Sequence, residues 1–187
     1  MRYCITFLFL LQVCFAQEAK VYESLDSALA NKQTATHLSL KKNKLKSVPP
    51  EVFELKGLVF LDLSKNKIDS IPVEIGKLSK LEVLNLARNR IDTLPIEIGQ
   101  LTKLEELRAG DNHIMYLPPE IGKLTELKIL DLWGNPISQL PDEIKACSKL
   151  EYLDFQGSLI NEHQQRAMRE VLPINATIKF PPPCGCN

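Results

Sequence analysis

The chain has 187 residues, of which 44% are hydrophobic and 25% charged, and its formal net charge at pH 7 is zero. This composition is typical of a globular protein of ordinary domain size and excludes a disordered chain. Because neither charge dominates, we expect no global attraction to anionic lipid and no nucleic-acid partner.

The first sixteen residues have the layout of a secretory signal peptide. Arg2 is a positive start, residues 5–11 are almost wholly apolar, and Cys14 and Ala16 place small residues at the −3 and −1 positions of a cleavage site. We expect cleavage after Ala16 and a protein that is secreted, periplasmic or attached to the cell surface. An alternative is a lipoprotein anchored through Cys14, although Val13 is bulkier than the residue expected before a lipidated cysteine. No later apolar stretch is long enough for a transmembrane segment.

Residues 17–34 are predicted to form an N-terminal helical cap. Tyr22, Leu25, Ala28 and Leu29 recur at helical spacing, which predicts a short helix over about residues 23–30. Its apolar face would cover the first residues of the segment that follows.

Residues 35–160 repeat themselves with a period of 23 residues. Asparagine, proline and a branched aliphatic residue each recur at this step in five successive units. The asparagines are Asn43, Asn66, Asn89, Asn112 and Asn135. Self-similarity of this length is the signature of a repeat protein in which each unit stacks on its neighbours, and we expect about six units.

The unit at residues 58–78 predicts the local structure of all the others. Leu61 and Leu63 alternate with outward-facing residues, which indicates a short strand with one buried face. Strands stacked in the same direction form a parallel sheet, so residues 72–78 must return on its far side as an irregular or short helical segment. One unit cannot bury its apolar residues alone, but its neighbours cover them.

The repeated asparagines stand where the chain turns out of each strand. Their amides offer both donors and an acceptor, so five of them would form a ladder that satisfies backbone groups in adjacent turns. We interpret this ladder as structural rather than catalytic. Ser158 stands at the equivalent position of the sixth unit.

The pattern then changes, and residues 161–180 are predicted to form a C-terminal cap. Asn161 is a suitable N-cap for a helix that runs to Leu172 and ends at Pro173. Residues 177–180 predict a last short strand.

Residues 181–187 form a tail rich in proline and cysteine. Cys184 and Cys186 would bridge each other, pair between chains or bond to a partner elsewhere, whereas Cys147 occupies a leucine position and is predicted to be buried. Asn175 opens a formal N-glycosylation sequence, which matters only in a host with that machinery.

These motifs resemble the leucine-rich repeat family. Residues 58–68 match L-x-x-L-x-L-x-x-N-x-L, and residues 71–78 resemble the L-P-x-x-I-G-x-L form of its Ras-suppressor-like and plant-type branches. The resemblance implies an α/β leucine-rich repeat solenoid, a curved horseshoe segment with a parallel concave sheet and helical caps at both ends. It also implies a protein-binding scaffold that holds a protein, peptide or glycan on the concave face. The cysteine clusters that flank such repeats in animal extracellular proteins are missing, which favours a bacterial secreted or surface protein over a eukaryotic ectodomain.

The register of the repeats places one side chain from each unit in the same column of this face. We predict that ligand-binding residues come from these columns. They are Phe60, Asp62, Arg88, Arg108, Ile129, Asp131, Trp133, Tyr152 and Asp154. Trp133 is the strongest candidate, because it is the only tryptophan and exposed tryptophan is typical of binding hot spots. The alternative is that it packs on Ile129 or Tyr152 to shield the sheet.

Charge is unevenly distributed over this face. Asp131 and Asp154 would lie about 4.8 Å apart on neighbouring strands, where a bound Lys, Arg or cation would offset their repulsion. The alternative is that aspartate is an ordinary residue at this strand position and that Arg108 offsets Asp131. The N-terminal half carries positive side chains instead. These are Lys41, Lys42, Lys65 and Arg88.

The sequence contains no arrangement typical of an enzyme. His37 and His113 lie at different phases of the repeat, and His163 lacks the second histidine that a zinc protease needs. We therefore predict no catalysis, no metal and no cofactor. The alternative to a binding scaffold is a structural or adhesive protein that self-associates through sheet edges or the terminal cysteines, although we expect a monomer.

Overall fold

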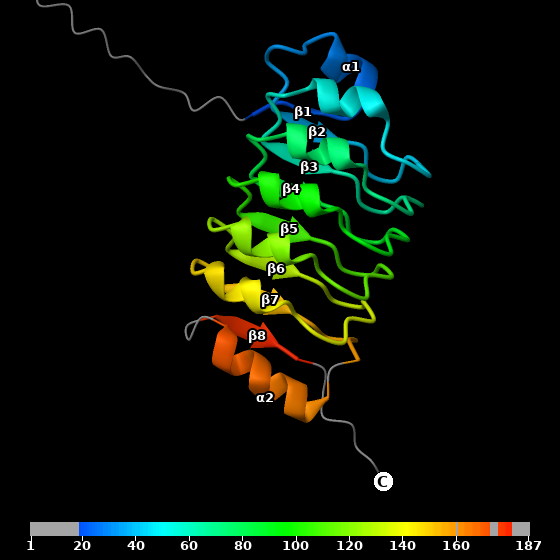
Figure 1. Cartoon of the computed structure of the whole chain (residues 1–187). Helices are drawn as coiled ribbons and strands as arrows, with labels where there is room; N and C mark the ends of the chain where they lie inside the picture. The colour runs from blue at the N-terminus through cyan, green and yellow to red at the C-terminus, as the bar shows by residue number, and fades with distance from the viewer. Residues whose placement is uncertain (1–18, 160, 173–175, 181–187) are drawn as a thin grey trace, which may run out of the picture.

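The computed structural model describes residues 19–159, 161–172 and 176–180, and its strands form one parallel sheet in chain order (Figure 1). The strands are β1 Val21–Tyr22, β2 His37–Ser39, β3 Phe60–Asp62, β4 Val83–Asn85, β5 Glu106–Arg108, β6 Ile129–Asp131, β7 Tyr152–Asp154 and β8 Thr177–Lys179. Strands β2 to β7 come from the six repeats, as the period predicted, and β1 and β8 extend the sheet at its two ends. The sheet is open, because β1 and β8 lie at opposite edges.

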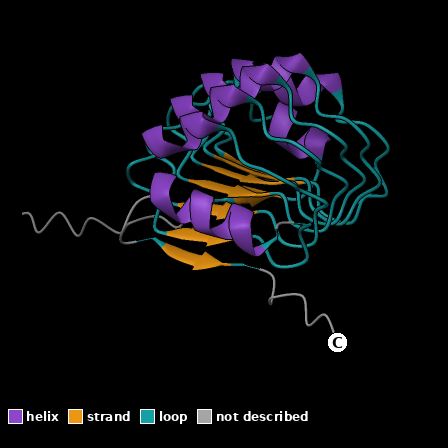
Figure 2. Cartoon of the chain, turned by 60° about the horizontal axis from the view of Figure 1, so that its bottom comes forward, coloured by secondary structure: helices purple, strands orange, loops and turns teal. Residues whose placement is uncertain are grey.

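Each of the first five repeats returns along the far side of the sheet through a short 3-10 helix (Figure 2). These helices are η1 Pro50–Glu54, η2 Val73–Lys77, η3 Ile96–Gln100, η4 Pro119–Lys123 and η5 Asp142–Ala146. A proline precedes each helix and its fixed φ favours this entry. The expected short helical return is therefore confirmed.

The core lies between the sheet and the 3-10 helices. Leu61, Leu63, Ile75 and Leu78 of one repeat have no exposed surface, and their equivalents in the next repeats continue the same rows. Leu107 is one such equivalent, and its replacement by alanine would cost about 2–5 kcal/mol.

Four of the five repeated asparagines form the predicted ladder. In each repeat the side-chain Oδ1 accepts a backbone N–H from the preceding repeat, and Nδ2 donates to one carbonyl of that repeat and one of its own. The members are Asn66, Asn89, Asn112 and Asn135.

The prediction was wrong for Asn43, which is exposed and makes none of these bonds within the described part of the chain. No complete repeat precedes it, so the ladder begins one unit later. It ends at Asn135, because the buried Oγ of Ser158 has no hydrogen-bond partner among the described residues.

The N-terminal cap combines a helix with a strand. Helix α1 spans Leu25–Leu29, and the Oγ of its N-cap Ser24 accepts the N–H of Ser27 at 3.3 Å. Tyr22 does not continue this helix, as its spacing suggested, but is buried in β1 beside Leu38. A two-residue strand carries too little pattern to be distinguished from the helical spacing.

The C-terminal cap matches its prediction closely. Helix α2 spans Glu162–Val171, and Asn161 and Gln164 form a reciprocal capping box with bonds of 3.0 and 2.9 Å. Met168 and Leu172 are buried as part of the hydrophobic core, α2 contacts η5, and β8 then pairs with β7.

Several predicted features lie outside the described residues. They are the leader at residues 1–16 with Cys14, the glycosylation position Asn175, and the tail at 181–187 with Cys184 and Cys186. In the ranges that are described, no helix has the length and apolar character needed to cross a bilayer.

Candidate binding surface

The side chains that alternate with the buried leucines form one continuous surface, which we call the outer sheet face. Phe60 pairs with Val83, Glu106 with Ile129, and Ile129 with Tyr152. The predicted columns are therefore the observed ones. Each column follows the direction of the solenoid, with strands about 4.8 Å apart.

The second column is part of the scaffold as well as the surface. Oδ1 of Asp62, Asn85, Asp131 and Asp154 each accepts the backbone N–H two residues later, at 2.8 to 3.1 Å. This bond lies at the end of each strand and stabilises the turn that follows. Asp62 and Asp154 are only 7% and 6% exposed, so the structure does not leave these two predicted ligand-binding residues on the accessible surface.

Asp131 and Asp154 are register partners, as predicted, but the chain supplies its own cation beside them. Lys179 of β8 pairs with Asp154, and its Nζ lies 3.8 Å from the carboxylate and 5.1 Å from the centre of the Tyr152 ring. The Tyr152 hydroxyl donates to the same carboxylate at 2.8 Å. The negative charge of Asp154 is therefore already compensated within the protein.

Asp131 has the less favourable environment. Burial raises the pKa of Asp131, the neighbouring Asp154 adds to that rise, and the N–H of Trp133 acts in the opposite direction. Arg108, its register partner on the other side, acts to lower the pKa of Asp131, but the Arg108 guanidinium forms its ion pair with Glu106. A ligand that brings a positive group to Asp131 would find a carboxylate without a dedicated cation.

Trp133 lies in the turn that follows β6 and is exposed to 44%. Its neighbours in the same column are Gly110, which has no side chain, and Gln156, which is exposed. The ring pairs in the described part of the chain are His37 with Phe60 and Phe155 with Phe180, and they do not include Trp133. The indole therefore stands open to solvent rather than stacked on Tyr152.

The remaining predicted residues lie farther towards the N-terminus. Phe60 is half-buried and stacks on His37 with ring centres 5.7 Å apart. Arg88 is exposed on the turn after β4, 3.9 Å from the carboxylate of Asp111. The nine candidates therefore do not form one cluster, and those near Trp133 occupy only β5 to β7.

Sequence reasoning missed Lys179. The step from Asp154 to Lys179 is 25 residues rather than 23, because helix α2 interrupts the repeat, so the register could not be extended through the cap. It also passed over Met115 and Tyr116, which are 54% and 56% exposed on the loop after β5. Their only signal was a departure from the polar residues at the same positions of other repeats.

Side chains that can ligate a metal or act as nucleophiles also occur among the described residues. No group of three His, Cys, Asp or Glu side chains in this part of the chain is placed to hold a metal ion. Cys147 is fully buried as predicted, and this burial raises the pKa of its thiol to about 11, which suppresses its reactivity.

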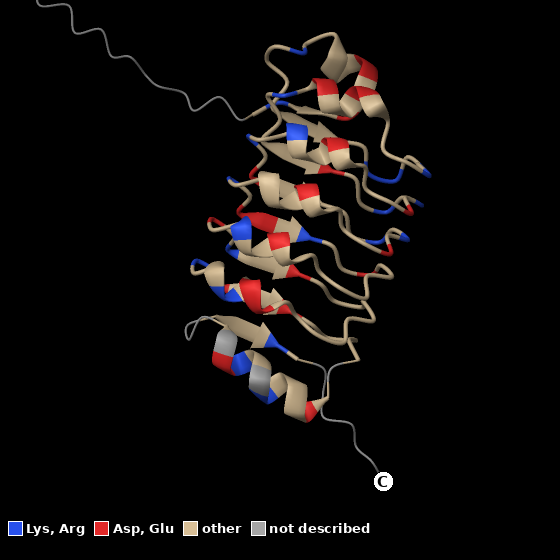
Figure 3. Cartoon of the chain, viewed as in Figure 1, with Lys and Arg blue, Asp and Glu red and all other residues tan. Residues whose placement is uncertain are grey.

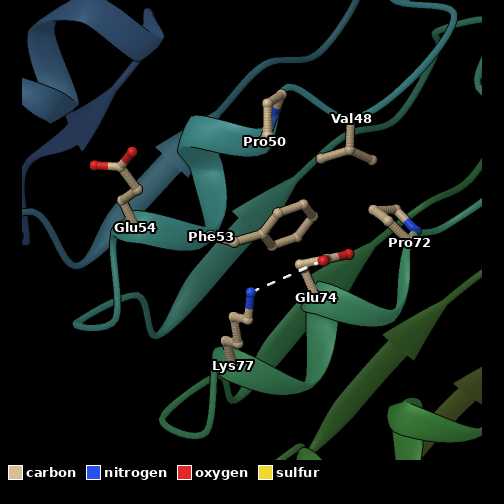
Figure 4. Close-up of a pocket in the computed structure, with 7 residues that line it drawn as sticks. All are labelled: Val48, Pro50, Phe53, Glu54, Pro72, Glu74 and Lys77. Carbon is tan, nitrogen blue, oxygen red and sulfur yellow. Dashed lines mark ion pairs between the residues drawn. The ribbon is translucent and has the colours of Figure 1, made fainter.

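A hollow of about 360 Å³ lies on the far side of the sheet, between η1 and η2 (Figure 4). Phe53 of η1 occupies the position at which later helices carry Gly76, Gly99 and Gly122, and η1 packs less closely on η2 than the later helices pack on one another. The charged residues within the hollow include Lys77 and Glu74, which pair with each other at 3.8 Å. We attribute the hollow to the bulk of Phe53 rather than to a ligand.

Comparison with known families gives one consistent result. A family model for leucine-rich repeat regions matches residues 26–112, and a second, for two copies of leucine-rich repeats, matches residues 102–145. No curated protein matches the chain.

Solved structures with the same architecture come from bacteria and plants. A leucine-rich repeat protein of Leptospira interrogans is 30% identical over 87% of this chain and 47% of its own, with a TM-score of 0.70. The leucine-rich repeat ectodomain of the plant membrane receptor kinase GASSHO1/SCHENGEN3 from Arabidopsis thaliana was solved in complex with Casparian strip integrity factor 2. It is 30% identical over 67% of this chain and 18% of its own, with a TM-score of 0.51.

The functional domain of InlJ from Listeria monocytogenes is 21% identical over 78% of this chain and 29% of its own, with a TM-score of 0.63, which supports the fold alone. The chain spans less than half the length of each of these three proteins.

Proposed function

Because the chain belongs to the leucine-rich repeat family, we propose that it is a protein-binding scaffold whose ligand contacts the outer sheet face around Trp133. The observation that carries this proposal is the 44% exposure of the only tryptophan, in a turn whose backbone is held by hydrogen bonds to Asp131 and to Asp111. Tryptophan is enriched among the residues that dominate binding energies at interfaces. A fixed backbone adds to the affinity, because little freedom is lost on binding.

The chemistry around Trp133 favours a ligand that presents a positive group beside an apolar one. Asp131 lies two residues from the indole and lacks a dedicated cation, while Ile129 and Tyr152 supply half-buried apolar surface on the same face. A lysine or arginine of a partner protein or peptide would satisfy both features. A glycan could also stack on the indole, but it would leave the Asp131 charge without a counter-ion.

We propose that the protein acts outside the cytoplasm, as a secreted, periplasmic or surface protein. The support is the signal-peptide layout of residues 1–16, together with the membrane receptor ectodomain among its structural relatives. Mass spectrometry of the N-terminus after expression in a secreting host tests this. A new terminus at Gln17 supports the proposal, whereas an intact leader on a protein that stays in the cytoplasm contradicts it.

We propose a monomer without enzymatic activity. Both edge strands are short, and short edges resist edge-to-edge association. Light scattering at rising concentration, with and without reductant, separates this from the self-association alternative. A mass that doubles only without reductant would assign assembly to the terminal cysteines.

The outer sheet face is tested by partner capture with three forms of the full chain. These are the wild type, Trp133→Ala, and Tyr116→Ala as a control that removes an aromatic ring of similar exposure from a loop away from this face. We expect the wild type and the control to retain a shared partner and Trp133→Ala to lose it. Retention by Trp133→Ala would overturn the assignment of the site.

A further inference from the structure

Six cationic side chains form two parallel columns on the turns that follow β2, β3 and β4. We call this surface the basic edge, and its residues are Lys42, Lys44, Lys65, Lys67, Arg88 and Arg90. All six are exposed. In Figure 3 the positive residues of the first repeats lie along the loop edge of the solenoid, on its right-hand side. Later repeats replace them, for example with Asp111 and Gly134, so the positive charge is confined to three turns.

The backbone holds these columns rigidly. The N–H of Lys42 donates to the Ser64 carbonyl at 3.1 Å, and the N–H of Lys65 donates to the Ala87 carbonyl at 2.9 Å. Bonds of the same kind connect the second column between successive repeats. The side chains therefore start from fixed positions about 4.8 Å apart along the solenoid.

Little within the protein balances this charge. Among the six residues, the described ion pairs include only Arg88, at 3.9 Å from the Asp111 carboxylate. The neighbouring charges, first Arg88 and then Lys42, lower the pKa of Lys65, and loss of hydration and Lys41 act in the same direction, whereas Asp62 acts against them. The cations of the basic edge thus repel one another.

The backbone conformation adds a second cost. Lys42, Lys65 and Arg88 have φ angles of 62°, 59° and 60°, in the left-handed region that favours glycine or asparagine. At the equivalent positions the fourth repeat carries Asp111, with a φ of 57°, and the last two repeats carry Gly134 and Gly157. The fold does not need a cation at this position, because an aspartate and two glycines fill it in the later repeats, so lysine or arginine in three successive repeats supports a role for their charge.

We propose that the basic edge binds a linear sulfated polysaccharide, which lies along the solenoid across the turns after β2, β3 and β4. Sulfate groups form charge-assisted hydrogen bonds with lysine and arginine, and flexible lysines tolerate the variable positions of sulfates along a chain. The residues between the two columns are Asn43, Asn66 and Asn89. They supply neither an aromatic platform for nucleic-acid bases nor an apolar side chain that would anchor the edge in a membrane.

The test compares two triple variants of the full chain with equal net charge. Lys42→Asn/Lys65→Asn/Arg88→Asn removes one column while placing a residue that tolerates a positive φ. Its control is Lys56→Asn/Lys80→Asn/Lys103→Asn. This variant removes three exposed lysines from the loops that precede β3, β4 and β5, so they lie near the opposite ends of the strands from the basic edge. Urea unfolding confirms that both variants remain folded. Binding is measured with dextran sulfate, with uncharged dextran, and with vesicles of equimolar phosphatidylcholine and phosphatidylserine.

We expect the wild type to bind dextran sulfate but not dextran, with an affinity that falls as salt rises. Each cation near an anionic surface contributes about fivefold to the affinity. Loss of three cations should therefore weaken binding of dextran sulfate about 100-fold. The control variant should bind like the wild type. Equal weakening of both variants would overturn the proposal, because the attraction would then be diffuse. So would a wild type that fails to bind dextran sulfate, or that binds the vesicles in its place.

Discussion

The asparagine ladder gives the sharpest prediction of stability, because one member can be removed with a defined consequence. Asn112 is 4% exposed, and its Oδ1 accepts the Ile91 N–H at 3.1 Å. Its Nδ2 donates to the carbonyls of Leu86 and Ala109 at 3.1 and 2.9 Å. Nδ2 also donates to the Gly110 carbonyl at 3.3 Å, so in Asn112→Ala all four bonds are lost.

The cost is smaller than four bonds would suggest, because the carbonyls have second donors. The Gly110 carbonyl also accepts the Arg88 N–H at 2.8 Å. Asn89 also donates to the Leu86 carbonyl at 2.8 Å, and Asn135 also donates to the Ala109 carbonyl at 2.9 Å. Only the Ile91 N–H is left unpaired. A buried unpaired group costs about 1–3 kcal/mol, and we expect the free energy of unfolding to fall by this amount.

Asn43→Ala is the matched control. It removes the same side chain at the same phase of the repeat from an exposed position, and we expect the free energy of unfolding to change by less than about 0.5 kcal/mol. Urea unfolding followed by far-ultraviolet circular dichroism measures both variants. Equal effects of the two substitutions would refute the account of the ladder.

Three further predictions concern packing, thiol chemistry and charge. Gly122→Ala should destabilise the protein, because the new Cβ would lie 2.4 Å from the Glu143 carbonyl oxygen, whereas Gly57→Ala, with its nearest contact at 3.5 Å, should be tolerated in thermal unfolding. Cys147 should resist alkylation at pH 8 in the folded protein and react in urea, as mass spectrometry of its peptide would show, because burial raises the pKa of its thiol to about 11. Asp131→Asn should leave stability at pH 7 unchanged or slightly higher. A raised pKa means that the folded state disfavours the charged carboxylate, so any gain should disappear in acid titration as Asp131 becomes protonated. A gain that persists at low pH would contradict this reasoning.

The repeats were predictable because a given position of the 23-residue unit carries the same kind of residue in the same structural role in every repeat. Leu61, Leu84, Leu107 and Leu130 are fully buried at identical positions, so the period alone placed the strands and their register. The two caps lack the 23-residue period, so each had to be predicted from its own local signals. The capping signal at Asn161 was strong enough to place α2, but β1 has only two residues and no repeated partner.

The surface was less predictable than the core, because exposure depends on the turn geometry around each side chain. Asp154 occupies a column that faces outward, yet its bonds to the Gln156 N–H and the Tyr152 hydroxyl bury it. The prediction that Asn43 belongs to the ladder was wrong because the sequence pattern does not show where the stack of repeats begins. Trp133 was correctly placed on an open surface, because its column neighbour is a glycine that the sequence already reveals.

The central claim, that a ligand covers Trp133, is best tested by labelling this single tryptophan with 5-fluorotryptophan and recording its ¹⁹F signal while the captured partner is added. The account predicts a shifted, broadened resonance and reduced access of the indole to a soluble quencher once the complex forms. An unchanged resonance in a complex that demonstrably forms would contradict it and place the ligand elsewhere on the solenoid.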